Sequence, residues 1–179
     1  MLAELEEIIQ YKQVDDQPEI QMSIRNTWAK RLSGCQRYVD VWQRILRVRL
    51  LVVSPQEDQA MWVKFANLCR KSGRANLAHK TLVLLFGTEP TKADKSIWTK
   101  HPLVTYSYLK YSWSCEDKQS ALNQLITFTN TMLADVGNSE QDSHSKQTLL
   151  ARCYLKIGEW KKALIDDNSI IVIFLFLSL

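Results

Sequence analysis

The sequence predicts an all-α fold, an α-solenoid of antiparallel helical hairpins, and three observations lead to this class. One pattern of apolar and small residues occurs twice, 85 residues apart. Pairs of helices recur about every 40 residues, because Ala121 lies 43 residues after Ala78 and 42 residues before Ala163. Only 5 glycines and 4 prolines occur among 179 residues, which favours long helices over a turn-rich β fold.

Each copy of the pattern reads as a helix, a glycine turn and a returning helix with a small alanine. The first copy is Trp62, Phe65, Ala66, Cys69, Gly73, Ala75, Ala78 and Leu82. The second copy is Leu150, Ala151, Tyr154, Gly158, Trp160 and Ala163, and Cys153 lies one place from the equivalent of Cys69. This order is typical of tetratricopeptide/HEAT-like units, which must stack to bury their apolar faces. We expect these residues, with Ala121, to be the structural positions of the repeats.

The helices before the first hairpin follow from apolar stripes and start signals. A short amphipathic helix begins at Leu2, and a second begins near Pro18, which suits the first helical turn, and ends at Gly34. A third is expected from about 36 to 52. Ser54 and Glu57 are spaced as a capping box, so the next helix should begin there.

The remaining elements follow from the same signals. We expect the first hairpin to turn at 72–74 and to end at Gly87. The later expectations are a surface loop at 87–101, helices at 102–113 and 117–133, a polar loop at 137–145, a helix at 146–157, a turn at 158–160 and a returning helix to 165.

Basic residues are concentrated between Arg25 and Val53, and Asp40 is the only acidic residue in this stretch. The basic residues are Arg25, Lys30, Arg31, Arg37, Arg44, Arg47 and Arg49. Such a stretch could bind phosphate groups, remain solvated, or dock on an acidic neighbouring repeat. Its aromatic residues lie on the predicted apolar stripe and not between the arginines, which weakens a base-stacking surface. We favour the solvated or docked face, and phosphate binding stays open.

The residue types that carry catalysis form no recognised motif. The glycines build no phosphate-cradling loop, and the histidines stand alone. The cysteines Cys35, Cys69, Cys115 and Cys153 contain no C-x-x-C pair, which argues against zinc and against a disulfide framework. We expect reduced core thiols, no metal, no cofactor and no catalysis by this chain.

Charge and hydropathy exclude further classes of protein. A net charge of +4 is too mild to predict nucleic-acid binding. The apolar run at 170–179 is shorter than the ~20 residues that a membrane helix needs, so we expect no transmembrane span. A tether formed by this run remains an alternative, as does a transferase, although the absence of phosphate and metal motifs argues against an enzyme.

Several stretches go beyond a generic repeat and carry a family resemblance. They are Met1-Leu-Ala-Glu-Leu-Glu-Glu7, Ile9-Gln-Tyr-Lys12, Arg31-Leu-Ser-Gly-Cys-Gln-Arg37, Leu51-Val-Val-Ser-Pro-Gln-Glu-Asp58, Lys71-Ser-Gly-Arg74, Leu77-Ala-His-Lys-Thr-Leu-Val-Leu-Leu85, His101-Pro-Leu-Val-Thr-Tyr106 and Ala151-Arg-Cys-Tyr-Leu-Lys-Ile-Gly-Glu-Trp160. Together they resemble the FAT domain of target-of-rapamycin (TOR) kinases, serine/threonine kinases of the phosphatidylinositol-3-kinase-related family. The resemblance covers 1–164, and 165–179 looks like a tail from a truncated gene model or unspliced transcript.

The resemblance implies a regulatory scaffold within a TOR-like kinase. A FAT domain is expected to clamp and position the kinase domain of the parent chain and to contact subunits of the TOR complex in growth and nutrient signalling. The implied location is cytoplasmic, and endomembranes through the parent complex. No catalytic residue is implied here, because the kinase motifs lie elsewhere in such proteins. The alternative is a free-standing adaptor that binds other proteins through its tetratricopeptide-like repeats.

Overall fold

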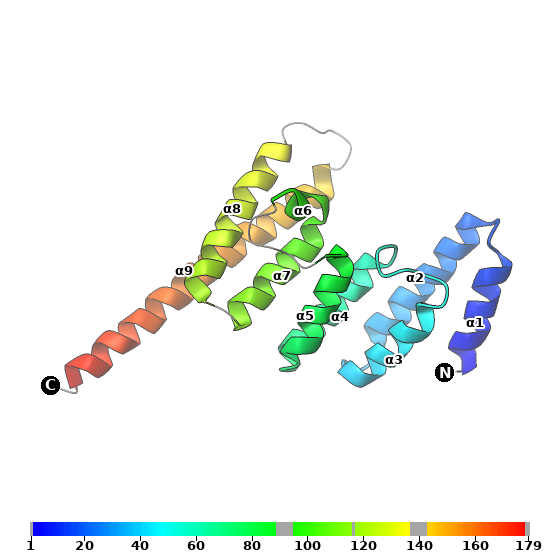
Figure 1. Cartoon of the computed structure of the whole chain (residues 1–179), viewed down its shortest axis with the longest axis horizontal. Coiled ribbons are helices and arrows are strands. Elements are labelled where there is room, and N and C mark those ends of the chain that lie inside the picture. Colours follow the sequence, from blue (N-terminus) through cyan, green and yellow to red (C-terminus); the bar gives the residue numbers. More distant parts are fainter. Residues whose placement is uncertain (1, 89–94, 116, 137–142, 178–179) are drawn as a thin grey trace. The chain divides into compact units, whose positions relative to one another are not determined.

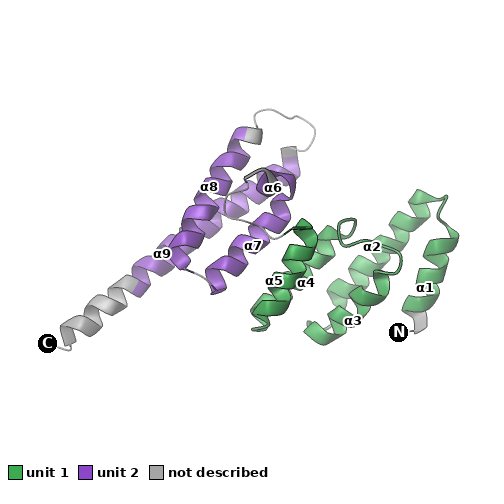
Figure 2. Ribbon diagram, in the orientation of Figure 1, with its two compact units in different colours: residues 1–89 green, residues 90–179 purple. Residues whose placement is uncertain are grey.

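The computed structural model describes residues 2–88, 95–115, 117–136 and 143–177 (Figure 1). Every regular element in these ranges is a helix, which confirms the all-α helical-repeat class. The helices group into two compact units, residues 1–89 and 90–179 (Figure 2).

Unit 1 holds five helices, α1 to α5. Their bounds are α1 Leu2–Gln13, α2 Pro18–Gly34, α3 Val39–Arg49, α4 Gln59–Lys71 and α5 Ala75–Phe86. Helix α1 packs against α2 and α3, α3 packs against α4, and α4 and α5 form an extensive hairpin. Pro18 occupies the first turn of α2, and Gly34 is its last residue, both as predicted.

The capping box forms but does not start α4. The Ser54 backbone N–H donates to Glu57 Oε2 at 2.8 Å, and the Glu57 N–H donates back to Ser54 Oγ at 3.3 Å. These bonds close a separate turn, and α4 begins later, at Gln59. The predicted start at 54–57 is therefore early by one turn.

The turn between α4 and α5 is a Schellman motif. Gly73 adopts a φ of +75°, where a side chain would be strained. The Gly73 N–H donates to the Arg70 carbonyl at 3.2 Å, and the Arg74 N–H donates to the Cys69 carbonyl at 2.9 Å. This pair of bonds satisfies the last carbonyls of α4 and reverses the chain. Gly87, also at φ +75°, ends α5 as predicted.

Unit 2 holds α6 Lys95–Lys100, α7 Pro102–Cys115, α8 Lys118–Val136 and α9 Ser143–Leu177. Helix α6 lies inside the segment that we predicted to be a loop, and its Trp98 is buried, so that prediction is wrong for 95–100. Residues 89–94, and 137–142 of the second predicted loop, lie outside the described residues. The core is built where α8 meets α7 and α9, around Leu109, Ala121 and Leu125.

Helix α9 contradicts the turn predicted at 158–160. It runs without interruption from Ser143 to Leu177, so Gly158 is an interior helical residue (Figure 1). The returning helix expected to 165 is the continuation of the same helix. The apolar run that begins at 170 is helical to 177. None of the helices in the described part of the chain has the length and apolar character needed to cross a membrane.

Candidate functional site: an ionic cluster and a cationic pocket

The first copy of the repeat pattern forms the contact face of the α4–α5 hairpin. The buried members are Trp62, Phe65, Ala66, Cys69, Ala78 and Leu82. The Trp62 and Phe65 rings meet edge to face, with their centroids 6.0 Å apart. Ala78 has no exposed surface, so its small side chain sets how closely the helices approach.

The second copy is placed differently from the prediction. Ala151 and Tyr154 are exposed on α9, with 49% of Tyr154 accessible, and Leu150 and Ala163 are half-buried. Trp160 is buried, and its ring stacks on Trp113 with centroids 4.3 Å apart and planes inclined by 7°.

Leu149 and Cys153 take the inward positions of α9 instead. They lie 84 residues after Phe65 and Cys69, so the buried faces correspond in a register one residue shorter than the predicted one. The position of Cys153 was the signal that could have identified this register. Ala121 is buried in the core of unit 2.

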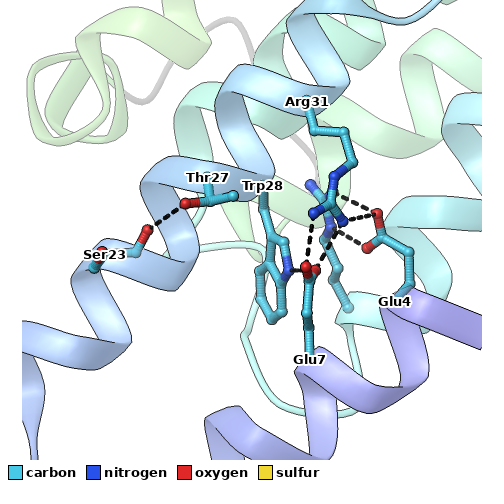
Figure 3. Close-up of polar contacts among 7 residues, drawn as sticks. Glu4, Glu7, Ser23, Thr27, Trp28 and Arg31 are labelled. Carbon is cyan, nitrogen blue, oxygen red and sulfur yellow. Dashed lines mark hydrogen bonds and ion pairs between the residues drawn. The ribbon is translucent and has the colours of Figure 1, made fainter.

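Unit 1 contains a network of charged and aromatic side chains, here called the ionic cluster: Glu4, Glu7, Trp28 and Arg31, which Figure 3 labels, together with Arg49. Arg49 donates from Nε and Nη2 to the two oxygens of Glu4, at 3.2 and 3.3 Å. Arg31 donates to Glu4 Oε1 at 3.2 Å and to both oxygens of Glu7, at 2.8 and 2.6 Å. The Trp28 indole Nε1–H donates to Glu7 Oε2 at 2.6 Å. One network therefore joins α1, α2 and α3.

Aromatic rings extend this network. The Arg49 guanidinium lies 5.1 Å from the centroid of the Trp28 ring, a cation–π distance. Tyr11 stacks on the same ring with centroids 5.5 Å apart and planes inclined by 26°. The Trp28 ring of α2 therefore contacts a cation of α3 and an aromatic ring of α1, and both contacts add to the packing of these three helices.

Burial and charge change the titration of carboxyls near the cluster. The hydrogen bonds from Arg31 lower the pKa of Glu7, although partial burial opposes this effect. Bonds to Glu7 and Glu4 in turn raise the pKa of Arg31. Asp58 behaves differently, because burial raises its pKa more than the nearby Arg49 lowers it.

The basic stretch therefore divides into docked and solvated residues. Arg31 and Arg49 dock on the acidic helix α1, and Arg49 is only 3% exposed. Arg44 and Arg47 are exposed on α3, away from its buried face. The sequence favoured a solvated or docked face but did not identify Glu4 and Glu7 as the acidic partners.

A cavity of about 390 Å³ in unit 1, here called the cationic pocket, lies where α2, α3 and α4 meet. It is lined by Ser33, Arg37, Trp42, Lys64, Asn67, Leu68 and Lys71. Within the ranges that the structure describes, Arg37, Lys64 and Lys71 have no carboxylate at ion-pair distance. The buried indole N–H of Trp42 has no hydrogen-bond partner among the same residues. The pocket is therefore lined by basic side chains that have no carboxylate partner among the described residues, and a buried donor of Trp42 lies in its wall.

The two core thiols, Cys69 and Cys153, are held in their protonated form. Burial raises the pKa of Cys69 and of Cys153 to about 11, so both remain protonated at neutral pH. All four cysteines are free, with Cys115 exposed and Cys35 half-buried. Among the described residues, no three side chains of the types that bind metals lie together.

Comparisons with known proteins match nearly the whole chain to one family. A family model described as the FAT domain matches residues 1–172. The chain is 41% identical to the serine/threonine-protein kinase tor1 of Schizosaccharomyces pombe over 93% of its own length. It is 44% identical to the serine/threonine-protein kinase TOR2 of Saccharomyces cerevisiae over 92%, and 44% identical to the serine/threonine-protein kinase mTor of Drosophila melanogaster over 93%.

The chain spans only 7–8% of the length of these three relatives. The family match continues to 172, beyond the predicted boundary at 164, and that boundary remains a prediction. From the extent of the match and the all-helical fold, we conclude that the chain belongs to the FAT domain family, of the type found in TOR serine/threonine kinases.

Proposed function

We propose that this chain is a regulatory scaffold segment that clamps and positions the kinase domain of a TOR-like kinase and contacts its partner subunits. The observation that carries the proposal is the FAT domain match over residues 1–172, on a chain built of packed helical hairpins. In this proposal the chain performs no chemistry itself. Its location is that of the parent complex, in the cytoplasm and at endomembranes, and its context is growth and nutrient signalling.

Rigidity of the helical units supports this role. A clamp regulates an enzyme by favouring one of two packed arrangements, which requires elements that move as bodies. In unit 1, the Schellman turn and the ionic cluster hold neighbouring helices together. In unit 2, Val104, Leu109 and Ser112 have no exposed surface, so one face of α7 is buried along most of the helix.

A chimera tests the scaffold. Residues 1–164 replace the corresponding segment of Saccharomyces cerevisiae TOR2, and kinase activity and partner co-precipitation are measured on the immunoprecipitated protein. We expect a functional kinase, and we expect Ala78→Leu, which forces α4 and α5 apart, to reduce both readouts. Lys80→Leu adds the same side chain on an exposed position of α5 and is the matched control. If the chimera that carries Ala78→Leu keeps full kinase activity and partner binding, the clamp is contradicted.

The size of the protein in cells distinguishes the free-standing adaptor from the scaffold segment of a kinase. An antibody raised against 54–85 is used on native cell extract. A single band far above 20.8 kDa supports the kinase segment, and a discrete band near 20.8 kDa supports the adaptor.

A second function, anion binding, is favoured by the cationic pocket. Three basic residues and Trp42 line a cavity whose volume lies within the ~300–1,000 Å³ range of small-molecule sites. Three cations around one cavity suit a ligand with more than one phosphate group. This proposal retains the phosphate-binding alternative for the basic stretch, but Lys64 and Lys71 come from α4, outside that stretch.

Calorimetry with tripolyphosphate tests the pocket. We expect binding that weakens as salt is added and that falls at least tenfold in Lys71→Ala. Lys80→Ala removes the same charge from an exposed position that does not line the pocket, and it should bind like the parent. Equal loss in the two variants would mean attraction by net charge rather than a built site.

A further inference from the structure

One residue that lines the cationic pocket can itself be converted into an anion. Ser33 is the second-to-last residue of α2, and it lines the cavity together with Arg37, Lys64 and Lys71. Ser33 is exposed, so a second protein can reach it. Helix α2 ends at Gly34, and residues 35–38 form an irregular segment before α3. Fraying of one helical turn therefore presents this serine in an extended chain.

The residues before Ser33 form a charge pattern that basophilic protein kinases select. Lys30 and Arg31 precede Ser33 by three and two positions, and both are exposed. Basic residues at these positions pair with acidic groups beside the active site of such a kinase and so select the serine that follows. Arg31 also donates to Glu7, so the kinase competes with the ionic cluster for this side chain. Ser23, exposed on the same helix, has no basic residue at either position.

The modification is a phosphoryl transfer from ATP bound to the kinase. The Ser33 hydroxyl oxygen attacks the γ-phosphorus, a new O–P bond forms, and the bond from this phosphorus to the β–γ bridging oxygen breaks as ADP leaves. The hydroxyl proton passes to the catalytic base of the kinase. The serine side chain thereby gains a charge of about −1.5 to −2 at pH 7 and three strong acceptor oxygens.

The pocket has both the room and the charge for this group. Its volume of about 390 Å³ is many times the ~30 Å³ that one water molecule occupies, so a phosphate fits inside it. The carbonyl end of α2 disfavours an anion at Ser33. Charge-assisted hydrogen bonds from Arg37, Lys64 and Lys71 favour it, and three cations outweigh one helix end. Because the two lysines belong to α4, the phosphate would join α2 to α4.

We propose that Ser33 is a phosphorylation site for a basophilic protein kinase, and that its phosphate occupies the cationic pocket and bonds to the basic side chains there. The anion of the pocket is then part of the chain itself, and phosphorylation closes the pocket to soluble phosphates. This inference rests on the anion-binding function proposed above, because both use the same three cations.

The first experiment measures whether a kinase selects Ser33. The whole 179-residue chain is incubated with cAMP-dependent protein kinase and ATP, and the modified residues are located by tandem mass spectrometry. We expect phosphate on Ser33 and at least tenfold slower incorporation there in Lys30→Ala. Ser23→Ala is the matched control and should leave the rate at Ser33 unchanged. Absence of phosphate from Ser33 overturns the proposal.

The second experiment locates the phosphate. The chain is made with phosphoserine incorporated at position 33 during translation, and a ³¹P NMR titration gives the second pKa of the phosphate. We expect this pKa to lie at least ~0.5 units below that of the same phosphoserine in a peptide of residues 28–38, since nearby cations favour the dianion. Lys71→Ala should remove at least half of the difference, and Lys80→Ala, an exposed charge that does not line the pocket, should leave it unchanged. A pKa equal to or above that of the peptide overturns the proposal.

Calorimetry with tripolyphosphate separates this inference from the function on which it rests. We expect the phosphoserine chain to bind tripolyphosphate at least tenfold more weakly than the unmodified chain. Equal binding by the two chains overturns the inference and leaves the anion site in place. If the unmodified chain fails to bind while the phosphate pKa is still lowered through Lys71, the site for soluble anions is wrong and the Ser33 site stands. An unchanged circular dichroism spectrum in each variant shows that the chain remains folded.

Discussion

Replacing Glu4 with glutamine should destabilise unit 1 far more than the same kind of replacement at an exposed ion pair. Glu4 accepts two hydrogen bonds from Arg49, whose side chain is 4% exposed, and one from the more exposed Arg31. Arg31 keeps its bonds to Glu7 in the variant. Arg49 has no second carboxylate at ion-pair distance in the described ranges, so its buried charge loses its counterion.

The magnitude follows from this difference. Breaking a buried ion pair by removing one partner costs about 3–5 kcal/mol. The glutamine oxygen can still accept one hydrogen bond, worth about 1 kcal/mol. We therefore expect Glu4→Gln to lower the free energy of opening of α1–α3 by about 2–4 kcal/mol.

Hydrogen exchange measured by mass spectrometry is the appropriate assay, because it reads peptides of residues 1–53 separately from unit 2. The expected loss corresponds to roughly 30- to 700-fold faster exchange of the amides that depend on this opening. Asp40→Asn is the matched control, since its bidentate pair with Arg74 is exposed on both sides and should contribute less than about 1 kcal/mol.

A double variant tests the cause. Replacing both partners, Glu4→Gln with Arg49→Met, removes the buried charge as well as its counterion and should recover most of the lost protection. The argument is refuted if Glu4→Gln speeds exchange no more than Asp40→Asn does. It is also refuted if the loss of opening free energy in the double variant equals the sum of the losses in Glu4→Gln and Arg49→Met.

Four further predictions concern packing, backbone conformation and the thiols. Ala78→Leu should lower the free energy of unfolding by about 1–3 kcal/mol, because Ala78 is fully buried where α4 meets α5 and leaves no space for a larger side chain. A lower urea midpoint for the unfolding of this hairpin would show the loss. Gly87→Ala should cost about 1 kcal/mol and lower the thermal midpoint, since φ is +75° there; an unchanged midpoint would contradict the strain. Cys115 should react with a thiol reagent at pH 8 well before Cys69 and Cys153. Burial raises the pKa of Cys69 in the folded state to about 11, against an ordinary 9.0. The contribution of this thiol to the free energy of unfolding is therefore complete below pH 9 and is lost as the pH rises towards 11. Measuring the free energy of unfolding at about pH 8 and at about pH 10.5 would reveal this loss.

The sequence was most informative where local signals and burial agree. In the α4–α5 hairpin, the apolar stripe of α4 ends at Cys69, and Gly73 supplies the left-handed residue that the Schellman turn requires. Each signal depends on residues close in sequence, so the hairpin could be predicted before its partners were known. The same holds for Pro102 and Gly87, which begin and end helices as expected.

Prediction was weakest where the deciding partner is distant in sequence. Arg49 looks like one of several arginines until α1 brings Glu4 to it from 45 residues away. Trp98 lies in a segment without apolar periodicity, and its burial follows from the packing of α6 on α7 and α8. The cationic pocket is likewise assembled from three helices, so the charge of a single stretch could not reveal Lys64 or Lys71.

The contrast between Gly73 and Gly158 shows why one glycine turns the chain and the other does not. If α4 continued straight past Cys69, the next positions on its buried face would be Asn76 and Lys80, which are polar. The turn avoids that burial and brings Ala78 to the contact instead.

In α9 the face that carries Cys153 continues through Ile157, Trp160 and Leu164, all of which pack on the core of unit 2. A straight helix therefore keeps burying apolar surface after Gly158, and this gain exceeds the roughly 1 kcal/mol that an interior glycine costs. The residues on both sides of a glycine, and not the glycine alone, decide whether a repeat turns. A comparison of the two copies should therefore test whether the residues after the glycine would remain on the buried face of a straight helix.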